Sequence, residues 1–212
     1  MKAIVTLLSL LPAAMYATTG FAAGGEEPSR QQVAPIQLAL WNPVQTSDEN
    51  AKVHGLRLNL PYGANREVQG FDFGFASRTN GDQYGLNLGG GSYVQGDMRG
   101  AQLNFAVSIA RGRTFGLQEA IYNQSGSLYG VQSGLVNRID DAGVGARLAL
   151  VNYSGTSMQG AEFGLVNHAR RVRGLQLGFV NVASELHGVQ IGVLNFAKNG
   201  FLPFFPVINS AM

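Results

Sequence analysis

The stretch Gly174-Leu-Gln-Leu-Gly-Phe-Val-Asn181 is followed, six residues later, by Gly188-Val-Gln-Ile-Gly-Val-Leu-Asn195. The same phrase, with a glycine at its start, can be traced back through most of the chain. Self-similarity at a fixed period is the sequence signature of a repeat architecture. The sequence therefore predicts a tandem array of units about 15 residues long. The ten glycines that open the units are Gly55, Gly70, Gly85, Gly100, Gly116, Gly130, Gly145, Gly160, Gly174 and Gly188.

Each unit contains three short apolar patches, and we number its positions from the opening glycine as position 0. Position +2 is polar in every unit, whereas positions +1 and +3 are mostly apolar, as in Leu175-Gln176-Leu177. A second triplet with a central polar residue follows at +6 to +8, as in Val180-Asn181-Val182. A third apolar residue precedes most glycines by two positions, as Val172 does. Alternation of apolar and polar residues is typical of half-buried strands.

A straight strand cannot bury all three patches, because the first and second triplets have opposite parity. Bends at Gly174 and Gly178 would remove this conflict, since glycine adopts the backbone angles and close approaches that a corner needs. We therefore predict an all-β, single-domain tandem-repeat β-solenoid of about 15 residues per coil with three short sides. We expect its apolar residues to face inward and its Gln and Asn side chains to face outward or to stack at corners. Ten coils at about 4.8 Å each would form a rod roughly 45–50 Å long.

An antiparallel β-meander, closed as an outer-membrane β-barrel, is the alternative fold. Tight-turn dipeptides such as Asn80-Gly81 and Ser154-Gly155 recur between the strand phrases, and such turns are typical of hairpins. Three outward apolar residues per strand would make a band shorter than the roughly 25 Å of a membrane barrel. The chain also ends in Asn209-Ser-Ala-Met212 rather than in an aromatic residue.

The two ends of the chain differ from the repeats. Lys2, an apolar run to Ala17 and the small residues around Ala22 predict a secretory signal peptide, and hence an exported protein. Proline and aromatic residues near the C-terminus predict a cap over the last strand edge. The predicted boundaries are 1–23 for the signal peptide, 24–34 for a flexible N-terminal segment, and 35–209 for one β-repeat domain, with an N-terminal cap at 35–54, repeats at 55–199 and a C-terminal cap at 200–209.

Composition excludes several classes of function. The chain has no cysteine, which removes disulfides, thiolate metal sites, thiol nucleophiles and the lipid-modified cysteine of a lipoprotein. Charged residues make up only 13% of the chain and the formal net charge is +2, so there is no electrostatic reason for it to bind nucleic acid.

The histidines and acidic residues carry no recognisable catalytic or metal-binding pattern. His54, His168 and His187 lie in distant units without zinc-site spacing, and we expect them to be solvent-facing turn residues. Asp140 and the adjacent Asp141 predict a solvated turn, because the nonapeptide of calcium-binding β-rolls does not occur around them.

Two further sets of charged residues have predicted roles. Asp72 and Glu162 share the outward +2 position, but six units, or roughly 29 Å, would separate them, which is too far for a catalytic carboxylate pair. The cluster Arg170-Arg171-x-Arg173 lies one turn before Glu185, which predicts an ion pair between turns worth under about 1 kcal/mol. Binding of anionic lipid or polysaccharide is the alternative role of this cluster. No catalytic, cofactor-binding or metal residue is predicted, nor any cofactor.

The phrases quoted from Gly174 and Gly188 resemble the surface-repeat proteins first noted in spirochaetes and found in many other bacteria. The opening Gly55-Leu-Arg-Leu-Asn-Leu-Pro-Tyr-Gly63, followed by Gly70-Phe-Asp-Phe-Gly74, is also similar to that family. The chain departs from the pattern in its degenerate units at Gly85, Gly116 and Gly130. The resemblance implies an exported protein of the cell surface or outer membrane without an assigned reaction.

Together these features predict a non-enzymatic, exported protein with a structural or macromolecular-interaction role at the bacterial cell envelope. Flat polar faces of Gln and Asn are expected to contact an unknown envelope or host macromolecule, and association with the outer membrane is included. Neither a nucleic-acid partner nor a small-molecule substrate is predicted. An outer-membrane barrel acting as a pore or anchor is the alternative. The expected location is the cell surface or outer membrane, with the periplasm as the alternative.

Overall fold

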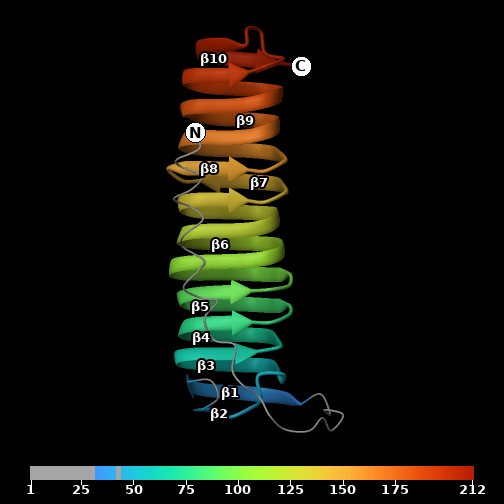
Figure 1. Ribbon diagram of the computed structural model, residues 1–212, viewed down its shortest axis with the longest axis vertical. Helices are drawn as coiled ribbons and strands as arrows, with labels where there is room; N and C mark the ends of the chain where they lie inside the picture. Colours follow the sequence, from blue (N-terminus) through green and yellow to red (C-terminus); the bar gives the residue numbers. More distant parts are fainter. Residues whose placement is uncertain (1–31, 42–43) are drawn as a thin grey trace, which may run out of the picture. The chain divides into compact units, whose positions relative to one another are not determined.

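The chain folds as a stack of β-coils. The computed structural model describes residues 32–41 and 44–212, and these form a β-solenoid of about nine turns with about 15 residues per coil (Figure 1). Each coil pairs in parallel with the next, so that Gly55 lies beside Gly70 and Gly70 beside Gly85. The predicted solenoid is confirmed, and the alternative antiparallel barrel is wrong because the repeats pair in parallel. The predicted signal peptide, 1–23, lies outside the described residues.

The strands form one sheet in the order β10-β9-β7-β6-β5-β4-β3-β1-β2, with β8 paired to β6 and β9. The two longest strands, β6 and β9, each wind through several coils without interruption (Figure 1). The bounds are β1 (Val33–Trp41), β2 (Val44–Gln45), β3 (Lys52–Asn65), β4 (Glu67–Thr79), β5 (Gln83–Val94), β6 (Met98–Ile139), β7 (Ala142–Leu148), β8 (Val151–Ser154), β9 (Ser157–Ala197) and β10 (Phe204–Ala211).

The opening glycines form a column in which no other residue fits. All ten have a positive φ between 113° and 148°, a backbone conformation that side chains with a Cβ rarely adopt. A Cβ on Gly174 would lie 2.1 Å from the carbonyl oxygen of Gly160 in the preceding coil. The predicted bend at position 0 is therefore present, and two independent constraints keep it a glycine. The second predicted bend, at Gly178, is not there: alternation continues through +4, and the chain turns between +5 and +6, where consecutive side chains such as Leu165 and Val166 both face outward.

The first and second triplets both face the opposite way to the prediction. Every +2 side chain is buried, whereas the +1 and +3 side chains are partly or largely exposed. In the regular coils the inward positions are −2, +2, +7 and +9. Alternation shows which residues share a face but not which face is inside. Our assignment of Gln and Asn to the outside was wrong, and the apolar assignment of the −2 position was right.

The interior consequently has an apolar half and a polar half. Apolar side chains at −2 and +9 form a continuous cluster in the C-terminal half of the stack, and a smaller cluster of Val94, Met98 and Ala110 lies nearer the N-terminus. Gln and Asn at +2 and +7 fill the remainder. The larger cluster consists of Leu128, Ile139, Met158, Ala169, Val172, Ala183, Leu186 and Ala197.

Both ends of the stack carry an antiparallel strand. β2 pairs antiparallel with β1 at the N-terminal end, and β10 pairs antiparallel with β9 at the C-terminal end. These strands occupy the predicted caps, with shifted limits. Residues 24–31 of the segment 24–34, which was expected to be flexible, lie outside the described residues, and β1 begins at Val33 within the rest of it. β10 runs to Ala211, whereas the predicted cap ends at 209.

Candidate functional site

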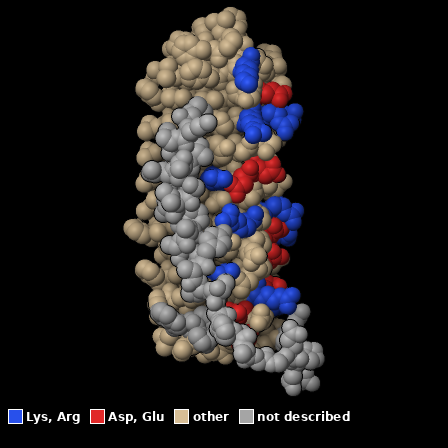
Figure 2. Space-filling model, in the orientation of Figure 1, with Lys and Arg blue, Asp and Glu red and all other residues tan. Residues whose placement is uncertain are grey.

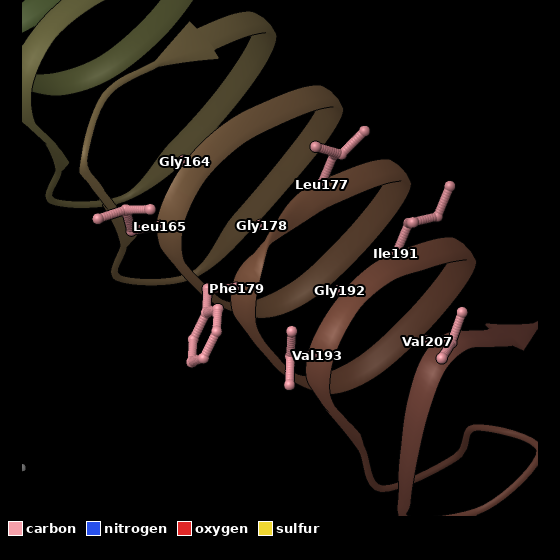
Figure 3. A pocket seen from close by; sticks show the side chains of 9 residues that line it. All are labelled: Gly164, Leu165, Leu177, Gly178, Phe179, Ile191, Gly192, Val193 and Val207. Carbon is pink, nitrogen blue, oxygen red and sulfur yellow. The ribbon is translucent and has the colours of Figure 1, made fainter.

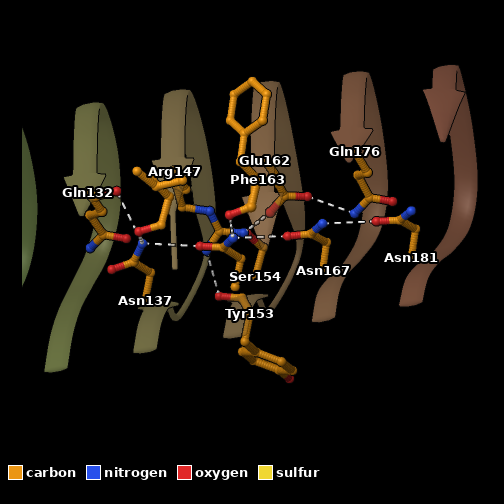
Figure 4. Close-up of polar contacts among 12 residues, drawn as sticks. Gln132, Asn137, Arg147, Tyr153, Ser154, Glu162, Phe163, Asn167, Gln176 and Asn181 are labelled. Atoms are coloured by element: carbon orange, nitrogen blue, oxygen red, sulfur yellow. Dashed lines mark hydrogen bonds and ion pairs between the residues drawn. The ribbon is translucent and has the colours of Figure 1, made fainter. Parts of the chain in front are cut away.

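Asparagines at +7 form a hydrogen-bonded ladder along the stack. Asn167 Nδ2 donates to Asn181 Oδ1 at 2.9 Å and also to the carbonyl oxygen of Leu177 at 3.0 Å (Figure 4). The same pair of bonds recurs from coil to coil, always directed toward the C-terminus. Because each amide is satisfied by its neighbours, its burial is not penalised. The members are Asn123, Asn137, Asn152, Asn167, Asn181 and Asn195.

Glutamines at +2 form a second ladder, directed the opposite way. Gln132 Nε2 donates to Gln118 Oε1 at 2.7 Å, and Gln190 Nε2 donates to Gln176 Oε1 at 2.8 Å, both toward the N-terminus. A one-directional ladder leaves one unpaired oxygen at an end. Asn123 Oδ1, Gln132 Oε1 and Gln190 Oε1 are accordingly buried without a partner, Gln132 being the last glutamine before the ladder is interrupted at Arg147.

Charged residues replace glutamine in the +2 ladder as paired opposites. Arg57 donates two hydrogen bonds to Asp72 of the next coil, from Nε to Oδ1 at 2.8 Å and from Nη2 to Oδ2 at 2.5 Å. Arg147 donates to Glu162 through Nη2 alone, and Gln176 Nε2 donates to the second Glu162 oxygen at 2.7 Å (Figure 4). Arg147 Nε is buried without a partner. All four charged side chains are fully buried.

Asp72 and Glu162 were expected to face outward, so this finding corrects the prediction for both. Sequence reasoning compared the two acids with each other and missed their arginines. The signal was available, because an arginine occupies the same +2 position one unit before each acid. A buried charge needs a close opposite charge and further hydrogen bonds, and parallel stacking supplies both.

The outer surface of the solenoid carries a column of large apolar side chains that is interrupted only at Gly90. Position +5 is apolar and exposed in nine coils, with exposed fractions between 45% and 79%. Mostly apolar residues at +1, +3 and +6 flank it, although +3 is the exposed Glu119 in one coil and Ser133 in the next. We call these four positions the apolar side. Contiguous exposed apolar surface of this extent marks an interaction site in a soluble protein. The +5 column consists of Leu60, Phe75, Phe105, Ile121, Leu135, Leu150, Leu165, Phe179 and Val193.

A groove of about 510 Å³ runs along the apolar side in the last coils (Figure 3). Its floor is the backbone of Gly164, Gly178 and Gly192 at position +4, and its walls are the +3 and +5 side chains on either side. Side chains inside the coil require glycine at these positions. A Cβ on Gly178, for example, would lie 2.6 Å from the side-chain amide of Asn167 in the ladder. The polar interior therefore creates the apolar groove outside it.

Val207 completes the lining of this groove. It lies at the irregularity in the pairing of β10 with β9, has a φ of 71° and is 70% exposed. A β-branched residue with positive φ is an energetically costly exception, and such strain clusters at ligand-binding and switch positions.

Aromatic and cationic side chains stack in columns on both flanks of the apolar side. At −1, the Arg99 guanidinium lies 5.6 Å from the ring of Tyr84 and 5.2 Å from that of Phe115. At +8, Arg138 lies 5.8 Å from the ring of Tyr153. Contacts of this kind stabilise by roughly 0.5–1 kcal/mol at exposed sites.

The side of each coil from +10 to −3 carries most of the exposed charge, and we call it the charged side. Lys and Arg alternate with Asp and Glu in a strip along the stack (Figure 2). Arg113 Nη2 lies 2.8 Å from Asp97 Oδ2. Burial of Asp97 opposes its ionised form, but hydrogen bonds from the Arg113 backbone and guanidinium outweigh that burial and lower the Asp97 pKa.

The histidines lie in strands rather than in turns, which corrects that prediction. His54 is exposed and lies 3.9 Å from Glu67. His168 is half-buried and stacks on Tyr153 with ring centroids 5.0 Å apart, and burial lowers its pKa. His187 lies 3.0 Å from Glu185.

The remaining charged candidates are solvated, as expected, although one predicted contact is wrong. Asp140 and Asp141 form an exposed bend between β6 and β7, where Asp140 pairs with Arg138 at 2.7 Å. Glu185 pairs with His187, not with the cluster that contains Arg170, Arg171 and Arg173.

Two other kinds of site are absent from the described part of the chain. No three His, Asp or Glu side chains of residues 32–41 and 44–212 are grouped so that they could hold a metal ion. Those same residues include no helix long and apolar enough to cross a membrane.

Comparison with known proteins finds no matching family model, no matching curated protein and no matching solved structure. The candidate functional site is therefore defined by its geometry alone. It is an extended apolar side, with aromatic and cationic columns on its flanks and a groove at its C-terminal end.

Proposed function

We propose that the protein is an exported, non-enzymatic structural protein that acts at the bacterial cell envelope by binding a partner along its apolar side. The observation that carries this proposal is the +5 column, in which nine large apolar side chains lie exposed from Leu60 to Val193. A chain that gains its stability from inside the coil has no folding need for these side chains.

The binding surface differs from the polar one that we expected. Gln and Asn at +2 and +7 form their hydrogen bonds with neighbouring coils inside the stack and are not exposed. The repeated surface that a partner would contact is an array of Leu, Phe, Val and Ile side chains. Regular repeats typically use such extended surfaces for binding, and an array of apolar side chains does not supply the convergent polar groups of a catalytic pocket.

Cell fractionation tests this proposal. The full chain, expressed in a bacterium and followed with an antibody, is expected in the envelope fraction, with an N-terminus near Gly24 after removal of the signal peptide. Recovery from the cytoplasm with residues 1–23 still attached would overturn the exported role.

A matched pair of variants assigns retention in the envelope to the apolar side. Replacing Leu135 and Leu150 by Gln removes two adjoining members of the +5 column and is expected to release the protein from the envelope. Replacing Gln95 by Asn and Lys198 by Gln, both exposed on the charged side, is the control and should leave retention unchanged. Equal retention of both variants would contradict binding through the apolar side.

A further inference from the structure

The geometry points to the surface of a lipid bilayer as the partner of the apolar side. The solenoid lies lengthwise on the bilayer with its +5 column among the acyl chains. This inference rests on the proposed function and names the partner that the proposed function leaves open. The inference involves no membrane-spanning segment. It depends on how polar and apolar side chains are distributed over the outer surface.

Polarity changes in order around each coil. The apolar side lies opposite the charged side, and the aromatic and cationic columns at −1 and +8 separate the two on both flanks. Elements that lie in a membrane interface bury an apolar face to a depth of about 5–10 Å and keep the charged face in water. Tyr rings and Arg stems occupy the level between the two. Tyr84, Tyr93, Tyr129 and Tyr153 all lie in these flanking columns.

A convex apolar ridge favours fluid lipid over a second copy of the chain. Positions +5 and +6 both face outward, so the sheet bends between them, and exposed apolar residues lie on both sides of the bend, as Leu165 and Val166 do. A rigid copy of the solenoid can cover one side of a ridge at a time. Acyl chains cover both sides together and along the whole stack.

The groove in the last coils has the lining that a hydrocarbon chain requires. Gly164, Gly178 and Gly192 form a smooth floor, and the walls hold only Leu, Ile, Val and Phe side chains. The groove is shallow and open to the outside, so its volume of about 510 Å³ is space in which an apolar chain can lie along the surface rather than an enclosed cavity. Val207, held at positive φ with its side chain exposed, adds an apolar contact at β10.

Flotation with vesicles of pure phosphatidylcholine tests the inference directly. The protein, purified as the cell exports it, is expected to float with these vesicles, and to do so equally in about 1 M salt, where charges are screened beyond about 3 Å. Flotation only with anionic vesicles, and its loss in salt, would assign binding to the charged side and overturn the inference.

A variant of the +5 column should weaken this binding without unfolding the chain. Replacing Phe75, Phe105 and Phe179 together by Gln is expected to lower vesicle partitioning at least about tenfold, because three inserted rings are lost. The control replaces Arg170, Arg171 and Lys198, exposed on the charged side, by Gln, and should partition like the original protein. Both variants should melt as the original does, since all six side chains are exposed.

Single cysteines report the orientation, since the chain has none of its own. A fluorophore sensitive to polarity is attached to Leu165→Cys in the +5 column or to Ser184→Cys, exposed on the charged side. A blue shift on adding vesicles is expected for position 165 only. Equal shifts at both positions would overturn the lengthwise orientation.

Different experimental results would overturn the proposed function and the lipid inference. Envelope recovery without vesicle binding, with a stable dimer by light scattering, would overturn the lipid inference in favour of a second copy and leave the proposed function standing. Envelope recovery without vesicle binding or a dimer would point to another envelope partner and overturn the lipid inference equally. Cytoplasmic recovery would overturn the proposed function even if the purified protein bound vesicles.

Discussion

At the scale of single residues, glycine at position 0 does what no other residue can do in this fold. Each of these glycines combines a positive φ with a carbonyl oxygen of the preceding coil only about 2 Å from the place of a Cβ. Relief of one constraint would not relieve the other. The invariance of this position within the chain therefore has a stereochemical cause that is independent of any partner.

Replacing Gly174 by Ala is expected to lower the free energy of unfolding by more than about 2 kcal/mol, because the backbone must shift away from the Gly160 carbonyl. Thermal unfolding followed by circular dichroism measures it. Gly91→Ala is the control, since a Cβ there would have its nearest contact at an ordinary 3.5 Å. Similar melting of the two variants would contradict the steric argument.

The buried pair of Arg147 and Glu162 replaces two glutamines of the +2 ladder. Glu162→Gln should destabilise the chain by about 3–5 kcal/mol, because Arg147 is left buried without its counter-charge. Adding Arg147→Gln should restore most of the loss. The glutamine introduced at position 147 can donate to the carbonyl of Tyr153, as Gln190 does to that of Phe196 at 3.2 Å.

A double-mutant cycle measured by thermal or chemical unfolding checks this expectation. We expect the second substitution, Arg147→Gln, to restore stability to the Glu162→Gln variant. The coupling free energy between the two sites then has the opposite sign to the loss caused by Glu162→Gln alone. If the double variant is less stable than either single variant, the charges contribute something that the amide ladder cannot replace.

At the scale of the element, a coil is stable because amide ladders let polar groups be buried on one side of a narrow interior. Asn and Gln side chains donate and accept along the stack, so each coil satisfies the next. Apolar side chains at −2 and +9 fill the other half. The outer face is thereby released from any part in the core.

Replacing Asn152 by Ala breaks the ladder in its middle. Asn152 accepts from Asn137 at 3.1 Å and donates to Asn167 at 2.9 Å and to the Phe163 carbonyl at 3.0 Å. We expect a loss of about 2–4 kcal/mol from the orphaned partners. Hydrogen exchange should speed up in the adjoining coils first, because each coil contacts only its neighbours.

Ser184→Ala, at an exposed position two residues before Leu186, is the matched control for this experiment. Its exchange pattern should be that of the original chain. Uniformly faster exchange over the entire stack of the Asn152 variant would contradict nearest-neighbour stability and indicate that the stack unfolds as one unit.

The sequence was informative about the period and about the corner at position 0, and misleading about the second corner and about which side chains face inward. The spacing of glycines such as Gly174 and Gly188 predicts the coil length, because a parallel stack repeats its corners in register. The triplet Leu175-Gln176-Leu177 does not reveal that Gln176 faces inward. That depends on partners one coil away, which become visible only when units are aligned in register. Such an alignment would also have shown the buried ion pairs.

At the scale of the whole molecule, stacking produces an amphipathic rod whose two ends must be closed. β10 covers the last parallel edge by pairing antiparallel with β9, and Asn195 Nδ2, at the end of its ladder, donates to the carbonyl of Phe205 at 3.1 Å. An uncovered strand edge offers a row of free N–H and C=O groups to another chain. The same parallel pairing that builds the stack would then join one molecule to the next.

Ending the chain after Gly200 is therefore expected to convert a discrete species into end-to-end oligomers, seen as a rise in molar mass by light scattering at increasing concentration. The control is Ile208→Lys in the full chain. It removes an exposed apolar side chain of β10 but keeps the pairing of that strand, so its mass should not change. If the control also associates, apolar contacts of β10 rather than its strand pairing govern assembly. If the truncated chain keeps its mass and melting temperature, β10 is dispensable as a cap, and the last coil must satisfy its own edge.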